Sequence, residues 1–186
     1  MKTLLLLDGL TPVSAYATLR SLAPESPSFL LESAPLAGER FGRYSIIGWR
    51  PQRIVALDRV SAELVRLRVQ DVMTHRVLSD ETVPKENALS LLRRHAASGT
   101  SFIQDVDIPR VVDSAVGFVS YDFVDTLEHV GGYVRSARIA QFLDGATMVV
   151  FDALLQTVTV YASAELEMQA AVSALRDADH APTHRL

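Results

Sequence analysis

Residues 29–49 read FLLESAPLAGERFGRYSIIGW, and this stretch decides the fold. It consists of two apolar runs of strand length, separated by a loop that contains Pro and Gly. This pattern predicts two antiparallel strands joined by a connection. The facing ends of the two strands would then bring an acid, two hydroxyls, a guanidinium and a phenol to one place: Glu32, Ser33, Arg43, Tyr44 and Ser45.

Outside this stretch, the dominant signal has a period of two. Residues 63–70, ELVRLRVQ, place Val65, Leu67 and Val69 on one face, which predicts a strand with one solvated face. Residues 151–161, FDALLQTVTVY, predict a hairpin with a longer loop. Several other strands are apolar on both faces and require cover on both sides. A large apolar face without such cover usually marks a partner.

Three segments have helical patterns. The first begins at Thr11 and Pro12, the second begins around Pro84, and the third follows Ser163. The sequence therefore predicts an α+β fold: a mostly antiparallel sheet of about eight strands with two or three helices on one face. We expect one domain over 1–163, followed by a terminal helix and a tail or severed linker over 164–186.

Composition limits the classes of function. The chain has 186 residues, a net charge of −4 and no cysteine. The charge gives no attraction to nucleic acid or to an anionic membrane, and the lack of cysteine excludes disulfides and zinc-thiolate sites. Asp8 interrupts the apolar start of the chain, so we expect no signal peptide or membrane span. These features predict a cytoplasmic protein.

Motifs for catalysis are missing, and the sequence predicts no catalytic residue and no metal ligand. There is no glycine-rich phosphate loop, no paired histidine spacing and no nucleophile elbow. The cluster SYDFVDTLEH could hold a divalent cation through Asp122, Asp125, Glu128 and His129. We favour a structural interpretation, in which a strand ends at Tyr121, Asp122 is an N-cap and Asp125 lies in the first helical turn. His95 is expected to be a partly buried helix residue.

The polar strand ends of residues 29–49 allow two interpretations. Glu32 either ends a strand in water or accepts a hydrogen bond from an ammonium group, and Arg43 can pair with a carboxylate, Glu32 itself being one candidate. Polar groups beside loops, between apolar strands, are typical of ligand pockets. If a ligand binds here, an amino acid is the natural choice because it carries both an ammonium and a carboxylate.

Four blocks give the chain a resemblance to a known family. They are TPVSAYATL (11–19), SFLLESAPLAGERFGRYSIIGWRP (28–51), SAVGFVSYDFVDTLEHV (114–130) and ATMVVFDALLQTVTVYA (146–162). Together they resemble the N-terminal region of the large subunit (component I) of anthranilate synthase and the related aminodeoxychorismate synthase component. The resemblance implies half of the two-sheet sandwich of chorismate-utilising enzymes. It also implies a wall of a tryptophan site formed by Glu32 and Ser33 of the LLES motif with Arg43, Tyr44 and Ser45.

The resemblance also implies what this chain lacks. The family's chorismate-binding domain, with its Mg²⁺-binding acids and catalytic groups, has no counterpart here, so we expect no cofactor in this chain and no activity from it alone. The expected role is a scaffold and regulatory module that binds tryptophan weakly by itself. Expected partners are a chorismate-binding domain, or a second copy through an apolar sheet face, and a glutaminase subunit. Two departures from the family pattern are Ser120 for a Gly and Asp125 for an Arg. The loss of the basic residue at position 125 puts an interdomain or local ion pair in doubt, but not the tryptophan wall.

The sequence also allows two alternative functions. The chain could be a separately encoded subunit of an active anthranilate or aminodeoxychorismate synthase. It could instead be a free-standing module that binds an amino acid or a protein partner.

Overall fold

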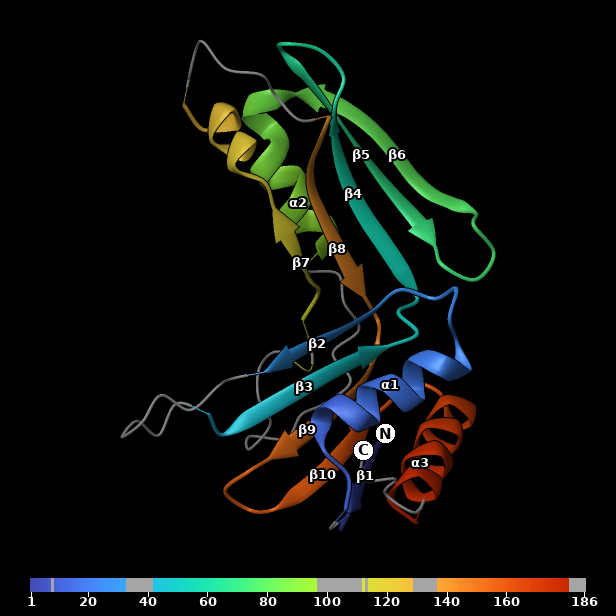
Figure 1. Ribbon diagram of the computed structural model, residues 1–186. Helices are drawn as coiled ribbons and strands as arrows, with labels where there is room; N and C mark the ends of the chain where they lie inside the picture. Colours follow the sequence, from blue (N-terminus) through green and yellow to red (C-terminus); the bar gives the residue numbers. More distant parts are fainter. Residues whose placement is uncertain (8, 33–41, 97–111, 113, 129–136, 181–186) are drawn as a thin grey trace. The chain divides into compact units, whose positions relative to one another are not determined.

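The computed structural model describes residues 1–7, 9–32, 42–96, 112, 114–128 and 137–180. The chain divides into two compact units, the first made of Met1–Pro51 and Ala146–Leu186 and the second of Gln52–Gly145. Each unit holds one five-stranded sheet in which all neighbouring strands are antiparallel (Figure 1). The predicted α+β class with antiparallel sheets is confirmed. The described part of the chain contains no helix long and apolar enough to cross a membrane.

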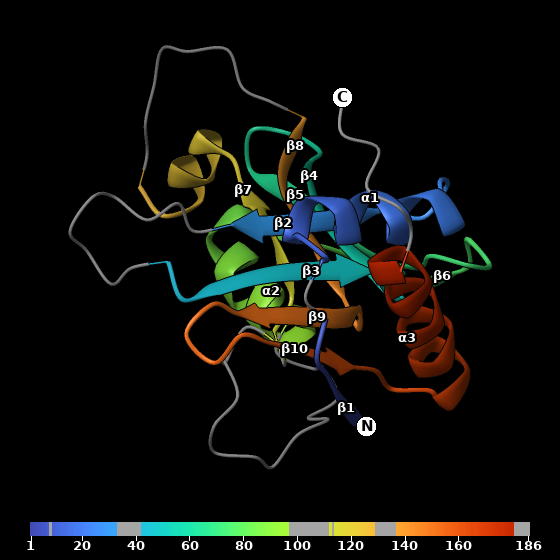
Figure 2. The same cartoon turned by 60° about the horizontal axis from the view of Figure 1, so that its bottom comes forward.

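The first unit combines the two ends of the chain. Its sheet has the strand order β1-β10-β9-β3-β2, and helices α1 and α3 pack on one face (Figure 2). The elements are β1 (Lys2–Leu5), α1 (Pro12–Leu22), β2 (Ser28–Glu32), β3 (Tyr44–Trp49), β9 (Thr147–Asp152), β10 (Thr157–Tyr161) and α3 (Glu165–His180).

Helix α1 begins where its sequence predicts. The Thr11 hydroxyl accepts a hydrogen bond from the Ser14 backbone N–H at 3.1 Å, and the Ser14 hydroxyl accepts one from the Thr11 N–H at 3.0 Å. This reciprocal capping satisfies two backbone donors that the first turn leaves unpaired. Pro12 occupies the first helical position, where no backbone donor is needed.

The core of the first unit lies between the sheet and its two helices. Ile47 and Trp49 of β3 pack there with Val149 of β9, and Leu19 and Leu175 close the core from α1 and α3. The alternate residues of the same strands, such as Ile46, Met148 and Val150, are buried as well. Strands β3 and β9 are therefore buried on both faces, as their uninterrupted apolar sequences predict.

The second unit has a different covering. Its strand order is β6-β5-β4-β8-β7, and α2 packs against β4 and β5. The elements are β4 (Arg53–Arg59), β5 (Leu64–Asp71), β6 (Val77–Pro84), the short 3₁₀ helix η1 (Lys85–Asn87), α2 (Ala88–Ala96), β7 (Val116–Val119), the 3₁₀ helix η3 (Tyr121–Thr126) and β8 (Arg138–Asp144).

The predicted alternation in the second unit is confirmed. Val65, Leu67 and Val69 of β5 are buried against α2, while Arg66 on the other face pairs with Asp80 of β6. A strand that is apolar on one face and charged on the other can leave its charged face in water.

The strand that leads into residues 121–126 ends earlier than the sequence predicted. Strand β7 ends at Val119 and Ser120 is the N-cap of η3. Asp122 lies in the first turn of η3 and is buried. The N-cap prediction for Asp122 is therefore wrong, because the backbone N–H of Ser120 still pairs with Ile139 of β8 and the 3₁₀ turn starts directly after it. His129 lies outside the described residues.

The C-terminal segment packs as part of the first unit. Met168, Ala171 and Leu175 of α3 belong to the same core as Trp49. The segment 164–186 was predicted as a terminal helix with a tail or linker, and its helix contributes to the fold of the preceding strands. Residues 181–186 lie outside the described part.

Candidate functional site

Four of the five predicted site residues lie at one end of the first unit's sheet. Glu32 is the last residue of β2, and the antiparallel register places it directly opposite Ser45 of β3. Tyr44 begins β3 and Arg43 precedes it. Ser33, the remaining predicted residue, lies outside the described residues.

The strand pleat divides these residues between two faces. Ser45 shares the helix-covered face with Ile47, and Glu32 shares that face because opposed residues in an antiparallel pair point to the same side. Tyr44 points to the other side, where the register pairs it with Asp152 of β9. The guanidinium of Arg43 lies 4.8 Å from the centre of the Tyr44 ring, within the range of a cation–π contact.

Arg43 forms an ion pair with Asp152. Its Nε lies 3.1 and 3.0 Å from the two carboxylate oxygens of Asp152, and its Nη2 lies 2.7 Å from Oδ2. The sequence offered Glu32 as one candidate partner for Arg43, but the paired carboxylate comes from β9, 109 residues further along the chain. Hydrogen bonding from Arg43 is the main reason why the pKa of Asp152 lies below its usual range.

Asp152 also shapes the β9–β10 hairpin. Its Oδ1 accepts hydrogen bonds from the backbone N–H groups of Leu154 at 3.0 Å and Leu155 at 3.1 Å. The backbone of Arg43 is fixed to the same hairpin, because its carbonyl accepts from the Ala153 N–H at 2.8 Å. One carboxylate therefore connects the start of β3 to the turn of the hairpin.

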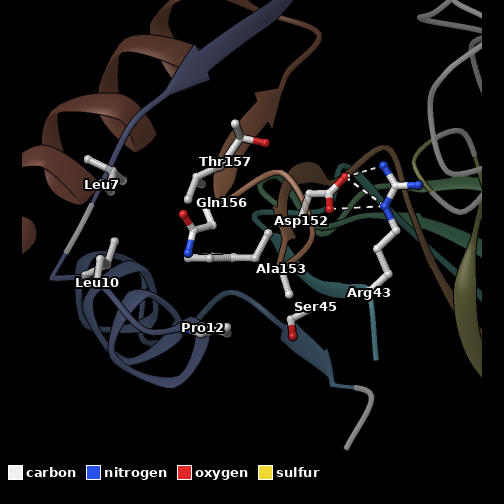
Figure 3. A pocket seen from close by; sticks show the side chains of 11 residues that line it. Leu7, Leu10, Pro12, Arg43, Ser45, Asp152, Ala153, Gln156 and Thr157 are labelled. Carbon is white, nitrogen blue, oxygen red and sulfur yellow. Dashed lines mark hydrogen bonds and ion pairs between the residues drawn. The ribbon is translucent and has the colours of Figure 1, made fainter. Parts of the chain in front are cut away.

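A cavity of about 280 Å³ lies beside this ion pair. Figure 3 shows Leu7 and Leu10 across the cavity from Arg43, with Gln156 between them. The cavity combines an apolar part with hydroxyl and amide groups, and its lining residues are Leu7, Leu10, Pro12, Arg43, Ser45, Phe151, Asp152, Ala153, Gln156, Thr157 and Val158.

The sequence predicts only part of this site. Arg43 and Ser45 were predicted, while the wall formed by the β1–α1 connection and the β9–β10 hairpin was missed. A signal does exist, since FDALLQTVTVY predicts a hairpin that begins at the end of an apolar strand. Nothing in the sequence, however, indicated that β9 pairs with β3 rather than with another strand.

The polar groups around the cavity are suited to binding a small molecule. The charges of Arg43 and Asp152 offset each other, and the other polar groups around the cavity are the hydroxyls of Ser45 and Thr157 and the amide of Gln156. Within the described ranges, no three His, Asp or Glu side chains cluster in a way that could hold a metal ion. A small amphipathic molecule matches such a lining.

The acidic cluster of the second unit has a structural role in this fold. Asp125 is buried and accepts a hydrogen bond from Arg59 Nη1 at 2.9 Å, while Lys85 Nζ lies 3.8 Å from the same oxygen. Asp125, one of the two departures noted above, is the acid of an ion pair with Arg59 in this fold. Similarly, His95 of α2 contacts Glu81 of β6 at 2.8 Å, as suits a partly buried helix residue.

Of the comparisons with known proteins, the one with solved structures gives a match. No protein-family model matches the sequence. A search of curated proteins also finds no match. Among solved structures, the chain is similar to the crystal structure of anthranilate synthase component I from Streptococcus pneumoniae TIGR4, with 19% identity and a TM-score of 0.52. The match covers 95% of this chain and 36% of that chain. At this identity the similarity shows the shared fold.

Proposed function

We propose that this chain is the scaffold and regulatory part of a protein related to anthranilate synthase component I, and that it supplies one wall of an effector site for tryptophan. The observation that carries the proposal is that Glu32 lies opposite Ser45 at one sheet end, where Ser45 and Arg43 line a cavity, in a fold similar to that enzyme component. In this role, Glu32 accepts a hydrogen bond from the ligand's ammonium group, and Ser33 and Ser45 supply hydroxyls. Arg43 and Tyr44 form the neighbouring edge of the wall.

Catalysis belongs elsewhere in this proposal. The chain spans about 36% of the related component, and conversion of chorismate needs a divalent cation with a positioned acid and base. We propose that a chorismate-binding part supplies these groups and the opposite wall of the effector site. A glutaminase subunit is a further proposed partner. We propose that the chorismate-binding part, or a second copy of this chain, docks through an apolar sheet face; Ile46 and Val150 are already buried within this chain and are not part of that surface.

Calorimetric titration tests the effector role. A single wall leaves much of an indole exposed, so L-tryptophan should bind the isolated chain more weakly than about 1 μM, because ligand sites normally bury most of a ligand's surface. Adding a chorismate-binding domain from a related enzyme should strengthen binding, and Glu32→Ala should abolish that gain. An unchanged affinity in Glu32→Ala, measured with the domain present, would contradict the assignment of Glu32.

A second candidate function follows from the position of the cavity. Its lining residues all belong to the first unit, which favours a free-standing module that binds a small amphipathic molecule without a second domain. Submicromolar binding of tryptophan by the chain alone would support this module and overturn the one-wall proposal. Production of anthranilate from chorismate, ammonia and Mg²⁺ on mixing with a chorismate-binding domain would instead identify an enzyme subunit.

A further inference from the structure

Strand β6 (Val77–Pro84) forms one edge of the second unit's sheet, and among the described residues no strand pairs with its outer side (Figure 1). Directly after the strand, the Lys85 N–H donates to the Glu63 carbonyl at 2.9 Å. Inward and outward backbone groups alternate along an antiparallel pair, so residues at odd distances from Lys85 direct theirs away from β5. The N–H and C=O groups of Asp80 and Thr82 therefore point outward. Such an edge is a template for pairing with another chain.

A cavity of about 400 Å³ lies between this edge strand and α2. Its apolar floor consists of Val83, which packs against the core of the second unit, and Leu91, which is 2% exposed. Its polar side consists of Asn87, Ser90 and Arg94. These three residues follow one another at spacings of three and four, which brings them to one side of the helical segment. The cavity therefore offers hydrogen-bond donors above an apolar floor, on the helix-covered face of the edge strand.

One acid holds Arg94 in place at this cavity. The Nη2 of Arg94 donates to Oε2 of Glu81 at 2.8 Å, while the Arg94 side chain is 63% exposed. Glu81 is fixed in turn by His95, whose Nε2 lies 2.8 Å from Oε1. Glu81 is the one hydrogen-bond partner of Arg94 in the described part of the chain. The remaining guanidinium N–H groups are therefore available to a second carboxylate.

The charges along the edge favour an acidic partner. Asp80 accepts a hydrogen bond from Arg66 Nε at 2.6 Å, and Arg68 Nε lies 3.6 Å from the same carboxylate. Glu81, the other acid of the strand, is paired with Arg94. Three arginines thus face two acids, and both acids are already paired. An incoming acidic chain is therefore stabilised here more than a basic one would be.

We propose that the β6 edge and this cavity bind an extended acidic segment of another protein. The segment adds a strand to the sheet through backbone hydrogen bonds with Asp80 and Thr82. A glutamate opposite Val83 enters the cavity, with its methylene groups over Leu91 and its carboxylate on Arg94. All of these residues belong to the second unit, so the proposal goes beyond the effector role and does not depend on it.

Synthetic peptides test both the strand addition and the cavity. Each is eight residues long, like β6, is rich in threonine and serine, and carries glutamate, glutamine or lysine at a central position. In NMR titrations of the full chain, the glutamate peptide should shift the amide signals of Asp80, Thr82 and Ser90. The glutamine and lysine peptides should bind at least about tenfold more weakly, the loss expected for one charged hydrogen bond. Equal binding of the glutamate and lysine peptides would overturn the proposal.

N-methylated peptides separate strand addition from binding in the cavity alone. In a strand that pairs with β6 and has its glutamate opposite Val83, the amides of the two residues flanking the glutamate face β6. Methylation of these two amides should abolish binding, whereas methylation of the glutamate's own amide, which faces outward, should leave it unchanged. Unchanged binding of the peptide with both flanking amides methylated would rule out strand addition.

A pair of variants tests the role of Arg94. Arg94→Gln should weaken binding of the glutamate peptide about tenfold and leave binding of the glutamine peptide unchanged. Arg93→Gln, the matched control, removes the same charge from the neighbouring position, which is exposed and does not line the cavity, and should leave both affinities unchanged. Equal losses in the two variants would show that the peptide responds to overall charge, and would overturn the assignment of the glutamate to the cavity.

The variant Thr82→Pro tests the open edge. Proline removes an outward N–H without removing a bond to β5, and should abolish binding of the glutamate peptide. If thermal melting shows that this variant does not fold, the methylated peptides on the unchanged chain decide the matter. A dimer of the unchanged chain that Thr82→Pro dissociates, measured by sedimentation, would show that a second copy occupies the edge and would overturn the proposal. The absence of any shift at about 10 mM glutamate peptide would also overturn it, and would leave the tryptophan proposal untouched.

Discussion

The two units contain hairpins of the same design that differ in one interaction. In the first unit, β9 and β10 are joined by DALLQT, and in the second, β5 and β6 are joined by DVMTHR. Each begins with an aspartate whose Oδ1 accepts from backbone N–H groups of the turn, and each has a residue with positive φ four positions later. Asp152 forms an ion pair with Arg43, whereas the Oδ1 of Asp71 also accepts from the Thr74 hydroxyl at 2.7 Å.

This difference indicates how a structural turn becomes part of a site. The carboxylate that closes a hairpin is already fixed in place by the turn, so a guanidinium that reaches it gains a preorganised partner. At Asp152 that partner positions Arg43 and one wall of a cavity. At Asp71 the same turn serves only the hairpin.

Replacing each of the two aspartates by alanine should give the largest difference between the hairpins, measured as the loss in free energy of unfolding. Asp152→Ala removes two backbone hydrogen bonds and the pairing with Arg43, and should lower the free energy of unfolding by about 1–3 kcal/mol. Asp71→Ala, the matched control, removes the turn hydrogen bonds from Thr74 and should lower the free energy of unfolding by less than Asp152→Ala does. Urea unfolding measures the first variant through Trp49, the single tryptophan of the chain, which is buried in the first unit's core. Amide hydrogen exchange in β5 and β6 measures the second.

Equal costs for the two variants would contradict this contrast. They would mean that the ion pair of Arg43, whose side chain is 41% exposed, adds nothing beyond the turn. Exposed ion pairs often contribute less than about 1 kcal/mol, so the measured difference gives the value of this one directly.

The second-largest expected difference is in how the pKa values of Asp152 and Asp71 respond to salt. The pKa of Asp152 is lowered mainly by Arg43, whereas that of Asp71 is lowered mainly by the backbone N–H of Thr74. Both depressed values stabilise the fold above the unfolded pKa of about 3.9, and this stability is lost as the pH falls through the folded pKa. Raising the salt concentration from about 0.05 to about 1 M screens the ion pair, so the Asp152 pKa should rise more than the Asp71 pKa. Carboxyl NMR titrations measure both, and equal rises would rule out Arg43 as the main cause.

The sequence predicted the local part of this arrangement and missed the distant part. The caps of α1, the alternation of β5 and the hairpin after Asp152 follow from residues within a few positions of one another. The adjacency of Glu32 and Ser45 also followed, because two consecutive antiparallel strands have facing ends. The pairing of Arg43 with Asp152 depends on β9 lying beside β3, a choice between several apolar strands of similar composition. Hydrophobic pattern alone does not make that choice.

The error at Asp122 has a different cause. An acidic residue after an apolar strand resembles an N-cap, but the first backbone pairing that is lost decides where a helix begins. Here Ser120 still donates to Ile139, which the sequence of residues 114–128 does not reveal.

Glycine substitutions in the two turns should have the smallest effect and the same sign. Gln156 has a φ of 52° and His75 has a φ of 56°, a left-handed region that costs a residue with a Cβ roughly 1–2 kcal/mol. Glycine removes this cost but gains entropy in the unfolded chain, so each substitution should stabilise its unit by about 0.5–1 kcal/mol. Gln156→Gly should also remove an amide from the cavity and weaken tryptophan binding, whereas His75→Gly should leave tryptophan binding unchanged. Stabilisation by His75→Gly but not by Gln156→Gly would show that the Gln156 side chain contributes contacts that offset the strain of its backbone.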